Sequence, residues 1–219
     1  MTKSGGKGVL SLLASLLLGA CVTTNQTSYK EANDPAPPLD RQVIYHLDRA
    51  FYEAPPDCVV VMPSKDTINS QLATMIEDSI ARHLTMKMPR IIGSNERKRL
   101  ERELAIDLSS ADGQQRFGQI TNCRGFLDWR AVEVSDEYAL VFSSRSIGLA
   151  VEMTHLSSNA ILWSASHVAQ RWDGGVPLSL TSIAFSAFEA AQFHGDQDIL
   201  PSMVDDVVRR IFVTLPELR

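Results

Sequence analysis

Histidines, cysteines and carboxylates supply much of the chemistry that a protein performs, and in this chain they are spread over the whole length. The five histidines show no His-x-x-x-His spacing and the three cysteines do not cluster, so no zinc site is predicted. The sequence also lacks Gly-x-Ser-x-Gly, Gly-x-Gly-x-x-Gly and a phosphate-binding loop. We therefore expect no metal, no cofactor and no catalytic site. The histidines are His46, His83, His155, His167 and His194.

Two pairs of carboxylates could act as general acid and base if each pair faced one site. They are Asp128 with Glu133, and Asp205 with Asp206. The first pair stands in a predicted strand and the second in a predicted helix, where acidic side chains are mostly exposed to water. The favoured interpretation is two solvated surfaces, and a hydrolase with an unrecognised site is kept as an alternative.

Two aromatic residues are the candidates for partner binding. Trp172 stands in the glycine-rich stretch Arg171–Gly175, which we predict to be a loop, and Tyr138 begins a long stretch rich in β-formers. Aromatic side chains are enriched in protein interfaces. Trp163 instead stands in an alternating stretch and is expected in the core.

The first 20 residues have the anatomy of a secretory signal. Lys3 and Lys7 give a basic start, the run Val9–Leu18 is mostly apolar, and two small residues follow it. This run is far shorter than the roughly 20 residues that a membrane-spanning helix needs. It is therefore not an anchor by itself.

The residues Leu18-Gly19-Ala20-Cys21 resemble a bacterial lipobox. The resemblance implies that the Cys21 thiol receives diacylglycerol, that the signal is cut off before it, and that the new amine is acylated. Val22 stands where an aspartate would retain a lipoprotein in the inner membrane. The expected location is thus the outer membrane, lipid-anchored and facing the periplasm. An ordinary cleaved signal followed by a chance cysteine is the alternative.

The composition is that of a globular protein, with 44% hydrophobic and 21% charged residues. Removal of residues 1–20 leaves 19 basic residues against 26 acidic ones, a net charge near −7. An acidic chain has no electrostatic footprint for nucleic acid, so we expect no nucleic-acid partner.

Three regions are predicted: a signal peptide over residues 1–20, a lipidated flexible tether over 21–39 and a single domain over 40–219. The tether is rich in Thr, Asn, Ser and Pro and cannot bury enough apolar surface to offset its ordering entropy. In Asp40–Glu53, the residues Ile44, Leu47 and Phe51 lie on one face of a helix, which predicts a helix there.

The domain opens with the continuous apolar run Cys58–Met62, which is typical of a central strand buried on both faces. The charged run Arg97–Glu103 is interpreted as a solvated helix face. Ser157-Ser158-Asn159 is predicted to be a hairpin turn in which Asn159 takes the left-handed conformation. The other expected elements are a helix from Ile68 to Leu84, a strand at Arg90–Ile92, helices through Leu100 and at Gln114–Thr121, strands at Gly125–Val134, Tyr138–Leu156 and Ile161–Ala169, and helices at Ser182–Phe193 and Asp198–Thr214.

This order, βαβα(α)βββαα, predicts an α/β (α+β) fold in which helices pack against a mixed sheet. A flexible tether is expected to precede the domain.

Several passages resemble one group of bacterial lipoproteins. They are the Val-rich strand ending in Pro63, the passage Gln119–Leu127 and the passage Leu156–Ser164. They are similar to the outer-membrane lipoproteins related to CsgG, LpoB, PelC and the N-terminal domain of TolB, and Trp129 and Tyr138 look closest to a Neisseria-type branch. The resemblance covers roughly residues 58–216. It implies an accessory part of an envelope machine with no catalytic site.

The resemblance also implies that the strands beginning near Cys58 and Cys123 are parallel neighbours, which would place both cysteines at the same end of the sheet. An exported protein meets an oxidising compartment, and these two cysteines are the ones left once Cys21 is lipidated. A Cys58–Cys123 disulfide is therefore expected, and two buried thiols are the alternative.

The expected function is that of a non-enzymatic outer-membrane lipoprotein that binds another envelope protein, with self-association into a homo-oligomer also considered. The first alternative is a CsgG-like oligomeric secretion pore component. Only Val132–Leu149 could supply one of its two membrane hairpins, and Glu133, Asp136, Glu137 and Arg145 interrupt the apolar pattern there.

Replacing Cys21 with serine is expected to abolish lipid attachment, because serine has no thiol to acylate. Membrane fractionation and labelling with a palmitate analogue measure this: the wild-type chain is labelled and sediments with membranes, and the variant does neither. Undiminished labelling of the variant would contradict Cys21 as the lipidated residue.

Overall fold

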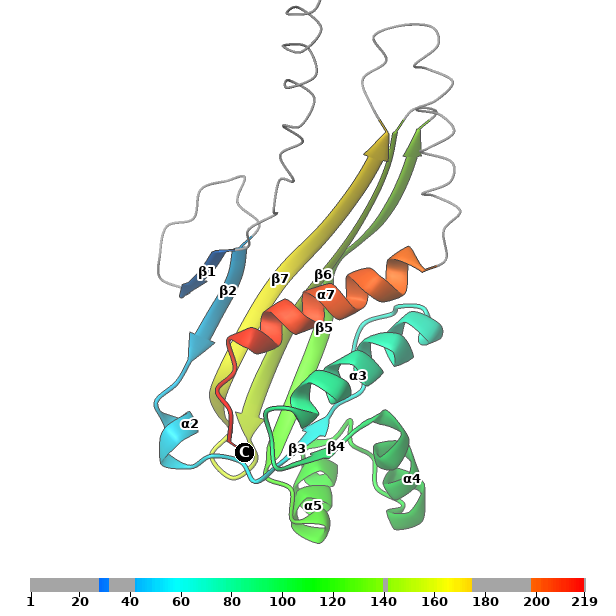
Figure 1. The fold of residues 1–219 in the computed structure, drawn as a ribbon. Coiled ribbons are helices and arrows are strands. Elements are labelled where there is room, and N and C mark those ends of the chain that lie inside the picture. The colour runs from blue at the N-terminus through cyan, green and yellow to red at the C-terminus, as the bar shows by residue number, and fades with distance from the viewer. Residues whose placement is uncertain (1–27, 32–41, 140–141, 175–197, 219) are drawn as a thin grey trace, which may run out of the picture.

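The computed structural model describes residues 28–31, 42–139, 142–174 and 198–218. Within this part the chain forms a seven-stranded mixed sheet in the order β1-β2-β7-β6-β5-β3-β4 (Figure 1). The pairs β1–β2, β3–β4 and β3–β5 are parallel, and the pairs β2–β7, β7–β6 and β6–β5 are antiparallel. The predicted mixed sheet is confirmed. The strands are β1 Ser28–Glu31, β2 Gln42–Leu47, β3 Cys58–Val61, β4 Arg90–Ile92, β5 Gly125–Ala139, β6 Phe142–His155 and β7 Ala160–Gly174.

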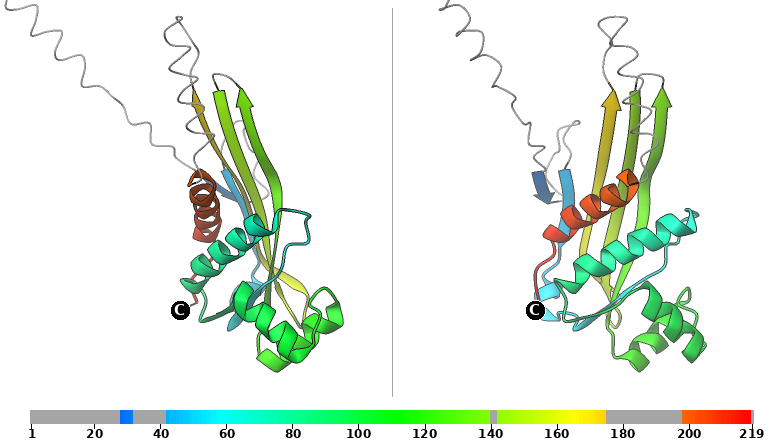
Figure 2. Two further views of the ribbon diagram at one scale, coloured as in Figure 1. Left: turned by 90° about the vertical axis from the view of Figure 1, so that its right-hand side faces the viewer. Right: turned by 45° about the vertical axis from the view of Figure 1, so that its right-hand side comes forward.

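Helices cover the two faces of the sheet unequally (Figure 2). The long helices α3 and α7 lie side by side across one face, whereas α4 and α5 lie against the other face at the β3–β4 end. The predicted packing of helices against the sheet is thus confirmed. The helices are α2 Ala50–Glu53, α3 Ser70–Thr85, α4 Ser94–Leu104, α5 Ala111–Thr121 and α7 Ile199–Val213.

The strand β3 is buried on both sides, as its unbroken apolar run predicts. Val59 and Val61 belong to the larger hydrophobic cluster beneath α3 and α7. Cys58 and Val60 belong to a second cluster on the opposite face, with Phe117 of α5. The core therefore has two parts, separated by the sheet.

Arg97 is the one residue of the charged run that the sequence interpretation placed wrongly. The run was predicted to be a solvated face, but the Arg97 side chain is 1% exposed. Its Nη2 donates to Glu77 Oε2 of α3 at 2.9 Å, and its Nη1 donates to the carbonyl oxygen of Val61 in β3. Burial of a guanidinium is tolerated because both a carboxylate and a carbonyl compensate it.

The predicted helix over Asp40–Glu53 is wrong for most of its length. Residues Gln42–Leu47 form β2, which pairs antiparallel with β7, and only Ala50–Glu53 are helical. Val43 is fully buried while its neighbour Ile44 is 44% exposed, as expected of adjacent side chains on opposite faces of a strand. Three β-formers in a row, Val43-Ile44-Tyr45, favour pairing with the open edge of β7 over an isolated helix.

Two segments predicted to be irregular are strands instead. Ser28–Glu31, inside the segment predicted as a tether, pairs with β2 as the strand β1. The predicted loop Arg171–Gly175 lies almost wholly in β7, which runs to Gly174 because β6 continues beside it. The predicted helix Ser182–Phe193 lies outside the described residues.

Three other predictions are confirmed. Asn159 has a φ of 52° in the turn between β6 and β7. Trp163 is fully buried and packs on Phe212 of α7. The last helix, predicted over Asp198–Thr214, is α7.

Cys58 and Cys123 are joined by a disulfide in this structure, with their Cα atoms 4.8 Å apart. Cys58 begins β3 and Cys123 precedes β5, and these two strands are parallel neighbours. Both cysteines are buried in the second hydrophobic cluster, which keeps the bond away from solvent.

Thiol counting tests whether this disulfide forms in the exported protein. The mature lipidated chain, denatured without reductant, is expected to show no free thiol, and reduction should release two. On the chain-entropy model a bridge across 65 residues stabilises the fold by about 4 kcal/mol. Two free thiols before reduction would rule the bridge out.

Replacing Arg97 with alanine is expected to lower the free energy of unfolding by about 3–5 kcal/mol, because Glu77 would be left buried without its partner. Urea denaturation measures the loss. Arg99→Ala is the matched control: Arg99 is 61% exposed and lies 3.8 Å from Glu103, so its loss should cost less than about 0.5 kcal/mol. The double variant Arg97→Met, Glu77→Leu should recover most of the stability. Equal costs for Arg97→Ala and Arg99→Ala would contradict the assignment.

Candidate functional site

One side of the sheet is left uncovered by the described helices over β2, β7, β6 and the middle of β5. We call it the open face. Pairing aligns its residues in two rows across the four strands: Asp128, Glu152, Ser164 and His46 in the first, and Arg130, Ala150, Ser166 and Ile44 in the second. The strands thus bring together residues that are more than 110 positions apart in the sequence, such as Ile44 and Ser166.

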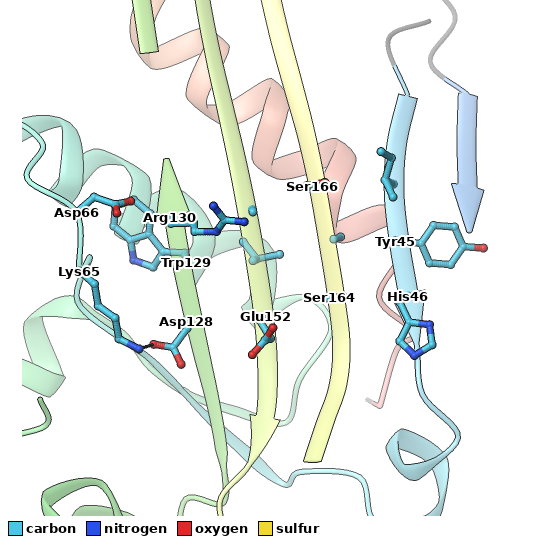
Figure 3. Close-up of a pocket in the computed structure, with 14 residues that line it drawn as sticks. Tyr45, His46, Lys65, Asp66, Asp128, Trp129, Arg130, Glu152, Ser164 and Ser166 are labelled. Atoms are coloured by element: carbon cyan, nitrogen blue, oxygen red, sulfur yellow. Dashed lines mark ion pairs between the residues drawn. The ribbon is translucent and has the colours of Figure 1, made fainter. Parts of the chain in front are cut away.

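The open face contains a hollow of about 440 Å³ (Figure 3). Its wall on one side is the segment after β3, which carries Lys65 and Asp66. Asp66 Oδ2 accepts a hydrogen bond from the Ala131 backbone nitrogen at 3.0 Å, and Lys65 Nζ lies 3.0 Å from Asp128 Oδ1. These contacts tie the segment to β5 and shape the hollow before any partner binds.

Arg130 and Glu152 are the two charged residues of the hollow that have no ion pair or hydrogen bond within the described part of the chain. They occupy diagonal positions on β5 and β6, because Arg130 pairs with Ala150 and Glu152 with Asp128. In Figure 3 the Arg130 side chain reaches toward β6. A free positive and a free negative group therefore stand on neighbouring strands.

Apolar groups border these charges. Ile44 is 44% exposed and Val132 is 42% exposed. Val132 is the extra residue of a β-bulge, where the pairing shifts between Ala131 and Glu133. A Cβ at Gly148 would lie 2.8 Å from Val132 Cγ2 and 2.9 Å from Val168 Cγ2, so only glycine leaves room for both valines. The open face is thus mixed, part charged and part apolar.

The row Glu152, Ser164, His46 contains the residue types of a hydrolase but not their arrangement. A nucleophilic serine needs a base within hydrogen-bond reach, and the base needs a third group to orient it. No hydrogen bond joins Ser164 to His46 among the described residues, and His46 Nε2 lies 3.9 Å from Asp48 Oδ2. The geometry suits binding better than acyl transfer.

The carboxylate pairs considered from the sequence do not form shared sites. Asp205 lies between α7 and α3, where it accepts from Arg82 at 2.9 Å and is 3.1 Å from His83 Nε2. Burial alone would raise the pKa of Asp205, but the hydrogen bonds from Arg82 and His83 outweigh it and hold the pKa below its ordinary value.

Asp206 instead has partners within α7: it accepts hydrogen bonds from Arg209 at 2.6 Å and from Arg210 at 2.8 Å. Burial again opposes these bonds, which nevertheless lower the pKa of Asp206. Asp128 is paired with Lys65, and Glu133 accepts a hydrogen bond from Ser146 Oγ. All four carboxylates therefore have structural partners.

The predicted partner-binding residues lie at the outer ends of the long strands, away from the hollow. Tyr138 of β5 pairs with Ser143, and Trp172 of β7 pairs with Ser144 in the next row. The structure thus brings their backbones into neighbouring rows of one three-stranded region. Cys21 lies outside the described residues.

Sequence reasoning missed Arg130, Glu152 and His46 as site residues. The alternation within each strand could have put Asp128 with Arg130 on one face of β5, and Ala150 with Glu152 on one face of β6. That the two faces are the same follows only from the register of β5 and β6. His46 could not be placed, because its segment was predicted to be a helix.

Two further searches cover the described ranges. No group of three or more His, Cys, Asp or Glu side chains there could hold a metal ion. None of the helices described has the length and apolar character needed to cross a membrane.

No family model matches this sequence, and no curated protein matches it. Solved structures show partial likeness. The PelC dodecamer from Paraburkholderia phytofirmans has a TM-score of 0.47 at 13% identity, over 81% of this chain and 98% of that one. The lipoprotein GNA1162 from Neisseria meningitidis has a TM-score of 0.42 at 15% identity, over 64% of this chain and 99% of that one.

The LpoB C-terminal domain from Salmonella enterica gives a TM-score of 0.37 at 12% identity, over 52% of this chain and 82% of that one. Identities and scores this low do not establish a function.

Proposed function

We propose that this chain is a non-enzymatic outer-membrane lipoprotein, anchored through Cys21 and facing the periplasm, that binds another envelope protein through its open face. The observation that carries the proposal is the pair of free charges, Arg130 and Glu152, in a hollow bordered by exposed apolar groups. The lipobox resemblance supports the anchor, and the resemblance to the CsgG, LpoB, PelC and TolB group supports an accessory role.

The composition of the open face suits a protein partner. Interfaces between proteins combine apolar contact with a limited number of polar bonds, and arginine is enriched among the residues that contribute most to binding. Ile44 and Val132 supply apolar contact, and Arg130 supplies a planar set of donors. A surface of this kind gains free energy by burial without needing a deep cavity.

The shape of the face restricts the partner. A hollow of about 440 Å³ accepts a convex element, such as a helix or a hairpin turn. Two hollow faces would leave a void between them, so the open face suits a different protein better than a second copy. The partner should present a carboxylate toward Arg130 and a basic group toward Glu152, around an apolar side chain.

Site-specific cross-linking of the full lipidated chain in cells tests this proposal. A photo-reactive residue at Ile44 is expected to cross-link to a different envelope protein, which mass spectrometry identifies. The same residue at Val213, which is 55% exposed at the end of α7, is the position control. Charge reversal by Arg130→Glu or Glu152→Arg should lower the cross-linking yield about tenfold.

Matched charge controls come from α4. Arg99→Glu and Glu103→Arg change equally exposed charges away from the open face and should leave the yield unchanged. All variants should keep the wild-type melting temperature, since none of the four residues is buried. Cross-linking of Ile44 to a second copy, or equal yields from Ile44 and Val213, would contradict docking of a different protein at this face.

A further inference from the structure

A second groove, of about 720 Å³, lies between α5 and the turn that joins β6 to β7. Figure 2 shows α5 at the end of the molecule where this turn lies. The groove is separate from the open face: it shares no lining residue with the hollow around Arg130 and Glu152.

One wall of the groove is a line of amide side chains. Gln115 and Gln119 are four residues apart and lie on one face of α5, and Asn122, the left-handed residue that ends the helix, follows them. All three are exposed, and their side chains have no hydrogen bond or ion pair within the described chain. Gln114 also lines the groove, but its Nε2 is used in a bond to the Leu108 carbonyl oxygen at 3.0 Å.

The other wall carries Arg124, Ser157 and Asn159. Arg124 and Asn159 are exposed and likewise have no side-chain partner among the described residues. No carboxylate lines the groove, although the whole chain has 26 acidic residues. The groove is therefore a locally basic site in an acidic protein.

The walls are held in place before any ligand arrives. A Cβ at Gly118 would lie 2.3 Å from Leu156 Cδ2 and 2.8 Å from the Cys123 carbonyl oxygen, so α5 contacts Leu156 directly. Asn122 and Arg124 flank Cys123, which is bridged to Cys58 of β3. Leu156 N donates to the Arg124 carbonyl oxygen at 2.8 Å, which joins Arg124 to the strand end that carries the β6–β7 turn. Preorganisation of this kind lowers the entropic cost of binding.

The spacing of the amides matches an extended polypeptide. A helix rises about 1.5 Å per residue, so Gln115 and Gln119 stand about 6 Å apart along α5. An extended chain repeats every two residues, about 6.6 Å. An amide side chain offers both a donor and an acceptor, which is what a peptide N–H and C=O require. Arg124 adds a planar donor set for a carboxylate.

We infer that this groove binds an extended, acidic polypeptide segment of a partner, with the amide line pairing to its main chain and Arg124 to a carboxylate side chain. The apolar lining is limited to Ala111, Leu156 and the small Gly118, so recognition rests on the main chain and the charge rather than on large apolar side chains. The inference goes beyond the proposed docking at the open face and does not depend on it.

Fluorescence anisotropy with the full lipidated chain in detergent micelles tests the inference. The probe is a fluorescein-labelled heptapeptide of alternating threonine and glutamate, and the same peptide with glutamine in place of glutamate is its neutral counterpart. The acidic probe is expected to bind about tenfold more tightly than the neutral one at low salt. Arg124→Gln should remove this difference, and Gln119→Ala should weaken both probes several-fold.

Arg116→Gln is the matched control for Arg124→Gln. Arg116 is an exposed arginine of α5 that does not line the groove. Its substitution should change the affinity less than twofold. If Arg116→Gln and Arg124→Gln weakened binding of the acidic peptide equally, the net charge of the protein would explain the effect, and the proposed site would be overturned. Absence of peptide binding would overturn the polypeptide as the ligand. So would Arg124-dependent binding of oligogalacturonate, an acidic oligosaccharide, without binding of the peptide. None of these outcomes changes the result of cross-linking at Ile44.

Discussion

Arg97 supplies the buried ion pair that ties α4 to the rest of the molecule. Ser94 and Arg97 are the buried residues of α4, and Leu100 and Leu104 are partly buried against the second hydrophobic cluster. The helix is thus attached both by this apolar contact and by the bonds of Arg97 to Glu77 of α3 and to Val61 of β3, aided by Ser94 Oγ, which donates to Asp78 at 2.8 Å. Because Glu77 belongs to α3 and Val61 to β3, the Arg97 side chain joins three elements at one buried point.

The unequal covering of the sheet gives its two faces different roles. The face beneath α3 and α7 holds the larger hydrophobic cluster, and the Asp205 carboxylate links the two helices through Arg82 and His83. Of the described helices, only α4 and α5 lie against the opposite face, at the β3–β4 end, and they leave the middle strands uncovered. The larger core and the proposed binding surface thus lie on opposite sides of the same strands, so residues of the open face can change with little effect on that core.

Patterns that depend on near neighbours were predicted correctly from the sequence, whereas features that depend on distant contacts were not. The apolar run of β3 and the stripes of α3 and α7 reflect burial along one element, and Asn159 reflects the geometry of one turn. The strand β2 was missed because its partner β7 lies more than 110 residues away, and the helical spacing of Ile44, Leu47 and Phe51 favoured a helix. Arg97 was missed because nothing in a charged run marks which residue meets a buried carboxylate. Arg130 and Glu152 became a pair only through the register of β5 and β6.

The Cys58–Cys123 bridge has a consequence for the order in which the chain folds. It closes a loop of 65 residues that holds β3, α3, β4, α4 and α5, together with most of the second hydrophobic cluster. Once oxidised, an unfolded chain keeps the ends of β3 and β5 together, so the loop-closure entropy of this parallel pair no longer slows refolding. The later strands β6 and β7 then add to β5 through short turns, as local hairpins. A chain exported from its N-terminus delivers these parts in the same order, with the closed loop ready to receive the hairpins that follow.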